Sequence, residues 1–170
     1  MNHALRTALA VVVVVIVQVA VFPQLRISGV VPDLGLVLAA SIAFSDGPES
    51  AAIAGFVAGL GYDLFLETPV GLSALSYALT GYAIGVLQTS LLRAPRWIAP
   101  VLGLAAGLLG GAIFVGSSAL AGVDEVVTDD APRIVAIAAL YDAALAVVVF
   151  PAVRRALRGR PEHAGAWHLR

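Results

Sequence analysis

The residues of this chain that could do chemistry are the carboxylates inside its apolar segments. Asp33 and Asp63 lie at the ends of apolar segments, and Asp142 lies in the middle of another. A buried carboxylate needs a hydrogen-bond partner, a counter-charge or a ligand, because its transfer out of water is costly. The first question is therefore what these three side chains bind.

The other groups on which catalysis and metal binding usually depend are missing from the apolar segments. The chain has no cysteine, and its histidines, His3, His163 and His168, lie in the terminal regions. This excludes disulfides and thiolate metal sites and leaves no histidine for a buried catalytic centre. The net charge of −1 gives no reason to expect a nucleic-acid partner. We expect no enzymatic activity, no metal and no cofactor.

Asp142 is the most costly of the three carboxylates. On membrane-insertion scales, a central aspartate makes the free energy of insertion about 2.5–3.5 kcal/mol less favourable. The apolar residues of the segment 134–150 together make it about 4 kcal/mol more favourable. We therefore expect Asp142 to be protonated or hydrogen-bonded inside a helix bundle. A structural contact, a contact with a partner protein and a ligand or proton pathway are all open. The candidate hydrogen-bond partners are Gln18, Ser76, Tyr77 and Tyr82.

Asp33 follows Pro32, a pair that is typical of a helix start. The side chain of Asp33 is expected to act as the N-cap of the next segment by accepting backbone N–H groups that have no helical partner. This structural role is an alternative to a functional one.

Small residues recur at spacings of four in three segments. On a helix this spacing keeps them on one face, where they let another helix approach closely. We expect packing within the chain, with a contact to another chain as the alternative. The three rows are Ala51, Gly55, Gly59 and Asp63; Gly81 and Gly85; and Gly103, Gly107 and Gly111.

The elements that position these residues are membrane helices. The chain has 170 residues, 60% of them hydrophobic, and a mean hydropathy of +0.96; soluble domains are about 45–50% apolar. We expect an all-α integral membrane protein with one transmembrane domain, residues 1–153, and a basic cytoplasmic tail, residues 154–170. The expected segments are 5–22, 34–44, 51–62, 72–92, 97–121 and 134–153.

The second and third segments are shorter than the roughly 17 residues that a lipid-facing span needs. They cross with little tilt, include their flanking carboxylates in the span, or form a re-entrant hairpin sheltered by protein. An uncleaved first span is favoured over a signal peptide, because no small-x-small site precedes Pro23. With six spans, eight arginines fall on the side of the two termini, and only Arg26 and Arg133 on the other. Both termini are therefore expected in the cytoplasm.

The order of several motifs resembles a known family. The motifs are Pro32-Asp33-Leu34, Gly55-Phe-Val-Ala-Gly59-Leu-Gly-Tyr-Asp63-Leu, Thr68-Pro-Val-Gly71-Leu72, Gly81-Tyr82, and Tyr141-Asp142 followed by Phe150-Pro151 and a basic tail. In this order they resemble the MreD family of bacterial rod shape-determining membrane proteins. The candidate partner-binding or structural positions are Pro32, Asp33, Gly55, Gly59, Asp63, Gly71, Tyr82 and Asp142.

The resemblance implies a six-helix bundle similar to the substrate-binding subunit of energy-coupling-factor transporters. It also implies a non-enzymatic scaffold in the bacterial cytoplasmic membrane that helps to control cell shape and lateral peptidoglycan synthesis. The implied partners are MreC, then MreB, RodA and a class B penicillin-binding protein, together with membrane lipids; a second copy of the chain is a further candidate. The alternative is a substrate-binding membrane subunit of a vitamin transporter, with a pocket near Asp33, Asp63 and Tyr82.

Overall fold

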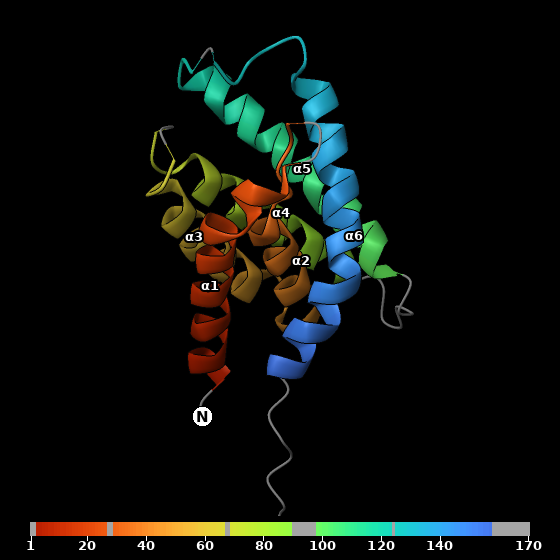
Figure 1. Cartoon of the computed structure of the whole chain (residues 1–170). Coiled ribbons are helices and arrows are strands. Elements are labelled where there is room, and N and C mark those ends of the chain that lie inside the picture. Colours follow the sequence, from red (N-terminus) through yellow and green to blue (C-terminus); the bar gives the residue numbers. More distant parts are fainter. Residues whose placement is uncertain (1–2, 27–28, 67–68, 90–97, 124, 158–170) are drawn as a thin grey trace, which may run out of the picture.

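The computed structural model describes residues 3–26, 29–66, 69–89, 98–123 and 125–157, and these contain six α-helices and no strand (Figure 1). This confirms the expected all-helical fold. The expected bounds differ from the observed ones by a few residues. Residues 154–157 of the expected basic tail belong to the last helix, and residues 158–170 lie outside the described residues. The elements are α1 (His3–Ala20), the short 3-10 helix η1 (Phe22–Leu25), α2 (Leu34–Asp46), α3 (Pro48–Asp63), α4 (Leu72–Thr89), α5 (Ile98–Leu120) and α6 (Ala131–Leu157).

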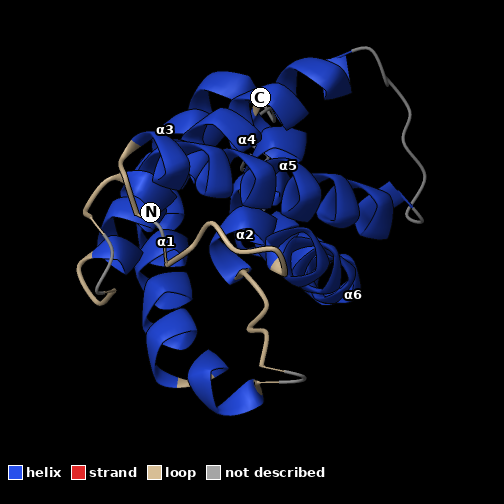
Figure 2. Cartoon of the chain, turned by 90° about the horizontal axis from the view of Figure 1, so that it is seen from above, coloured by secondary structure: helices blue, strands red, loops and turns tan. Residues whose placement is uncertain are grey.

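The centre of the bundle is α2, which contacts each of the other five α-helices (Figure 2). Every residue from Leu34 to Ala43 is buried. A helix that is apolar on all sides belongs in the interior of a protein, and α2 has this pattern. The other helices therefore separate α2 from the surroundings of the protein.

This position explains why α2 can be short. Its 13 residues correspond to a length of about 20 Å, against about 30 Å for the hydrocarbon core of a membrane. The length requirement applies to a helix that faces lipid, and α2 is sheltered by its neighbours. Shelter by protein was expected only for the re-entrant hairpin, and whether the two short segments cross the membrane stays a prediction.

The small residues of α3 and α4 face each other across a close helix contact. A Cβ atom added at Gly55 would lie 2.6 Å from the carbonyl oxygen of Tyr77, and one at Gly59 would lie 2.5 Å from that of Ser73. From the other side, a Cβ at Gly81 would lie 2.9 Å from the carbonyl oxygen of Ala51. These glycines therefore pack two helices of the same chain together.

The third row, in α5, packs in the same way against α6. A Cβ added at Gly103 would lie 2.6 Å from the carbonyl oxygen of Asp142, and one at Gly107 would lie 2.5 Å from the Cα atom of Ala139. Small residues let two helix backbones approach closely and form dispersion contacts. These contacts stabilise helix packing in a membrane, where no hydrophobic effect drives helices together. Packing within the chain was the expected use of these rows.

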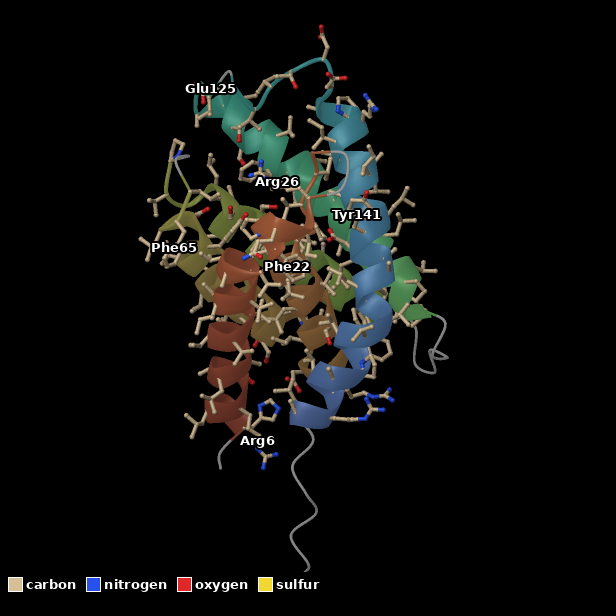
Figure 3. All side chains as sticks on the ribbon, viewed as in Figure 1. Arg6, Phe22, Arg26, Phe65, Glu125 and Tyr141 are labelled. Atoms are coloured by element: carbon tan, nitrogen blue, oxygen red, sulfur yellow. The ribbon has the colours of Figure 1, made fainter. Side chains whose placement is uncertain are left out.

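The two ends of the described chain lie at the same end of the bundle, where α1 begins and α6 ends (Figure 1). Nε2 of His3 in α1 lies 3.3 Å from Oδ1 of Asp46 at the end of α2. Figure 3 shows Arg6 at this end and Glu125 at the opposite one. Among the described helices, α1, α5 and α6 are long and apolar enough to cross a membrane.

Candidate functional site

The start of α2 is held by the side chain of Asp33. Its Oδ1 accepts hydrogen bonds from the N–H groups of Gly35 at 3.0 Å and Leu36 at 3.1 Å. These N–H groups lie in the first turn, where a helix provides no partner of its own. The expected N-cap is thus confirmed. The other oxygen, Oδ2, accepts a hydrogen bond of 2.7 Å from the hydroxyl group of Tyr77 in α4.

Gln18 of α1 binds the same segment from the other side. Its Oε1 accepts a hydrogen bond of 2.8 Å from the N–H of Leu34, and its Nε2 donates one of 3.1 Å to the carbonyl oxygen of Pro32. The side chain is buried. An amide has both a donor and an acceptor, so one glutamine satisfies two backbone groups where the chain enters α2.

Asp142 of α6 completes this polar network. The side chain is fully buried, and its Oδ1 accepts a hydrogen bond of 2.7 Å from the N–H of Asp33. Its Oδ2 has no hydrogen-bond partner among the described residues. We define the polar network as these four connected side chains, one each from α1, the start of α2, α4 and α6. They are Gln18, Asp33, Tyr77 and Asp142.

The hydrogen bond of Asp142 differs from the expected ones. Tyr77 and Gln18 belong to the same network, but they bind Asp33 and the backbone of residues 32 and 34. The hydroxyl of Ser76 donates to the carbonyl oxygen of Gly110 at 2.7 Å. Tyr82 is 49% exposed and lies outside the network. The partner that sequence reasoning missed is a backbone N–H, which no residue type signals.

Asp63 has a separate role at the end of α3. Its Oδ2 accepts hydrogen bonds from the N–H groups of Gly71 at 2.7 Å and Ala74 at 3.3 Å, and its Oδ1 accepts one from Ser73 at 3.1 Å. The carboxylate thus caps the start of α4, where the helix dipole also favours a negative charge. Gly71 has a φ of 111°, a conformation that favours glycine.

The other predicted site residues lie in different places. Pro32 is buried beside the polar network, and Gly55 and Gly59 are buried between α3 and α4. Tyr82 lies on the outer face of α4. Of Asp33, Asp63 and Tyr82, around which a pocket was expected, only Asp33 lines the cavity described next.

A cavity of about 430 Å³ adjoins the polar network on the side of α5 and α6. Asp33, Tyr77 and Asp142 line its polar part. Its apolar wall includes Phe114 and Val115 of α5 and Ile134, Val135 and Ala138 of α6. Glu125 and Thr128 also line it, so the cavity lies toward the Glu125 end of the bundle (Figure 3).

The described residues contain no group of three or more histidine, cysteine or acidic side chains that could hold a metal ion. Most hydrogen bonds of the polar network and of Asp63 go to backbone N–H groups near helix starts. The arrangement holds helices in place and offers one unused acceptor, Oδ2 of Asp142, next to a cavity.

Comparison with known proteins identifies the family. The family described as rod shape-determining protein MreD matches residues 2–159, nearly the whole chain. Comparisons with curated proteins and with solved structures find no match. The match agrees with three helices long enough to cross a membrane. The chain belongs to the MreD family of rod shape-determining membrane proteins.

Proposed function

We propose that this protein is a non-enzymatic scaffold of the bacterial cell-elongation machinery that binds MreC and thereby helps to control cell shape and lateral peptidoglycan synthesis. The observation that carries the proposal is the family match over residues 2–159. MreB, RodA and a class B penicillin-binding protein are further members of the proposed assembly.

The use of the polar side chains supports a scaffold. Both carboxylate oxygens of Asp33 and of Asp63 are bound within the chain, mainly by backbone N–H groups. Carboxylates that bind backbone N–H groups at helix starts hold the helices in fixed positions. A binding surface needs such a rigid support. The glycines of α3 and α4 are likewise committed to packing within the chain. The surface for a partner must therefore lie on an outer face.

The outer face of α4 is our candidate for this surface. We define the Tyr82 face as the exposed side chains at spacings of four, three and four, which keep to one side of the helix. Tyr82 adds a hydroxyl group to an otherwise aliphatic surface, and a polar group in the membrane gains by binding a neighbouring helix. The Tyr82 face consists of Leu75, Leu79, Tyr82 and Val86.

Co-purification from detergent with MreC tests the scaffold. The wild-type chain should retain MreC, and Tyr82→Ala and Leu79→Ala should weaken retention while the purified protein stays folded. Leu87→Ala is the matched control, because Leu87 is 61% exposed on α4 but points about 100° or more away from most of the Tyr82 face. Failure of the wild-type pair to associate on co-expression would remove the main support for the proposal.

We further propose that all six helices lie in the cytoplasmic membrane with both termini inside, in an architecture similar to that of energy-coupling-factor substrate-binding subunits. The start of α1 and the end of α6 lie at one end of the bundle, which supports a common side for the two termini (Figure 1). Because the chain has no cysteine, single cysteines report position directly. An impermeant maleimide on intact cells should label Thr128→Cys and should reach Ser45→Cys only after permeabilisation. The reverse pattern would contradict the orientation.

A further inference from the structure

The cavity beside the polar network combines an apolar wall with an acidic floor. Its volume of about 430 Å³ lies within the usual range of small-molecule sites, about 300–1,000 Å³. Side chains of Phe114, Val115 and Ile134 contribute to the apolar wall, and the carboxylates of Asp33 and Asp142 contribute to the floor. None of the described residues that line the cavity is arginine, lysine or histidine.

One acceptor in this floor is unused. Oδ2 of Asp142 is buried and has no hydrogen-bond partner among the described residues, whereas Oδ1 accepts from the N–H of Asp33. Both oxygens of Asp33 are occupied by Gly35, Leu36 and Tyr77. An unsatisfied buried acceptor costs free energy, so a donor that reaches Oδ2 would gain by binding there.

The space around this oxygen depends on Gly107. A Cβ atom at Gly107 would lie 2.8 Å from Oδ2 of Asp142 and 2.5 Å from the Cα atom of Ala139. The glycine thus lets α5 approach α6 closely without covering Oδ2 by a side chain. Asp142, which carries this acceptor, is one of the residues that line the cavity.

We propose that the cavity binds a small amphiphile with an ammonium head and an apolar body, with the ammonium group donating a hydrogen bond to Oδ2 of Asp142. An ammonium group has donors and no acceptor, which complements a carboxylate oxygen. The apolar wall accommodates the body of the ligand. An anionic head would meet the carboxylates of Asp33, Glu125 and Asp142 and no basic group among the described lining residues, so we expect anions not to bind. This site is separate from the Tyr82 face and does not depend on the scaffold.

Two sources carry this chemistry, a free alkylamine and a lipid with an amine in its headgroup. The probes are dodecylamine, dodecanol, dodecanoate and lauroyl lysophosphatidylethanolamine, each added to the full-length protein in a non-ionic detergent. Bound adducts are counted by native mass spectrometry, and the melting temperature reports ligand that binds the folded state. We expect dodecylamine to bind about tenfold or more tightly than dodecanol, and dodecanoate not to bind.

The lysolipid distinguishes the two sources. Binding of dodecylamine alone supports a free amine, and binding of both amines supports an amine-bearing headgroup as the source. Equal binding of dodecylamine and dodecanoate would overturn the proposed recognition, and so would the absence of binding by either amine.

Two substitutions locate the site. Asp142→Asn keeps an oxygen for the N–H of Asp33 but replaces the free acceptor with a donor, and should weaken dodecylamine binding about tenfold or more. Ala138→Leu fills the cavity without changing Asp142 and should abolish binding. Ala136→Leu adds the same volume on an exposed position of the same helix and should have no effect. Unchanged binding by Ala138→Leu would overturn the location.

The same variants separate this site from the scaffold. Ala138→Leu should lose dodecylamine and still retain MreC in the co-purification, because the cavity and the Tyr82 face are formed by different residues. Loss of MreC retention by a Tyr82→Ala variant that still binds dodecylamine would show the converse.

Discussion

The hydrogen bond between Tyr77 and Asp33 should contribute measurably to the stability of the bundle. Asp33→Ala removes the cap of α2, which is worth about 0.5–2 kcal/mol. It also leaves the hydroxyl of Tyr77 buried without its acceptor, which costs about 1–3 kcal/mol. We therefore expect Asp33→Ala to lower the free energy of unfolding by about 1.5–5 kcal/mol. Asp33→Asn keeps an acceptor at the N-cap and should cost less than Asp33→Ala.

Tyr77→Phe isolates the other half of the interaction. Phenylalanine keeps the ring that packs on Gly35 and leaves only Oδ2 of Asp33 without its donor. We expect a loss of about 1–3 kcal/mol. In the double variant no donor or acceptor of this hydrogen bond is left stranded. The double variant should therefore lose about 1–2 kcal/mol less than the sum of the two single losses.

The assay is reversible unfolding of the purified protein in bicelles, measured for the wild type, both single variants and the double variant. Tyr82→Phe is the control, because Tyr82 is half-exposed and lies outside the network, so removal of its hydroxyl group should change stability by about 0.5 kcal/mol or less. If the two single losses added to within about 0.5 kcal/mol in the double variant, the hydrogen bond would not couple these residues, and the reasoning would fail.

Three further substitutions test the other contacts. Gly59→Ala should lower the free energy of unfolding by about 1–3 kcal/mol, because its Cβ would meet the backbone of α4. Gly116→Ala is the control, since nothing lies within 4 Å of a Cβ at that position. An equal loss of stability in both variants would contradict the α3–α4 contact. Asp63→Ala should lower the free energy of unfolding by about 2–5 kcal/mol, because it leaves three backbone N–H groups without an acceptor. Hydrogen exchange of the amides at the start of α4 should then become faster. Unchanged exchange would argue against the cap. Gln18→Leu should cost about 1–3 kcal/mol because it strands the N–H of Leu34, and equal stability of this variant and the wild type in the same unfolding assay would refute that role.

Local signals in the sequence were sufficient for much of the fold. Six apolar segments predicted six helices, because each segment carries its own hydrophobicity and ends at turn residues. The N-cap at Asp33 was also predictable, since a cap binds N–H groups only two and three residues further along the chain. The row containing Gly55 and Gly59 predicted a close helix contact, although its spacing did not identify α4 as the partner.

Contacts between distant residues were not predictable in the same way. The N–H of Asp33 and the carboxylate of Asp142 are 109 residues apart in the sequence, and a backbone donor has no signature in residue type. The only sequence signal for the central position of α2 was its length, which is too short for a helix that faces lipid. This signal left both a spanning and a re-entrant arrangement open. The cavity arises where α5, α6 and the start of α2 meet, so no single segment indicates it.

Burial of a carboxylate in this chain does not by itself indicate a functional site. The hydrogen-bond partner of each carboxylate oxygen must be identified first. A membrane provides no water for the N–H groups at a helix start, so a chain with several helix breaks must supply acceptors from its own side chains. Asp63 meets this need with both of its oxygens, and Asp33 meets it with Oδ1, while Oδ2 of Asp33 accepts from the hydroxyl group of Tyr77. Asp142 meets it with Oδ1 alone, and the burial that makes this residue costly applies equally to Oδ2, which caps nothing. Contacts within the chain therefore account for both oxygens of Asp33 and Asp63 and for Oδ1 of Asp142, and the amphiphile that we propose for the adjoining cavity would supply the donor for Oδ2 of Asp142.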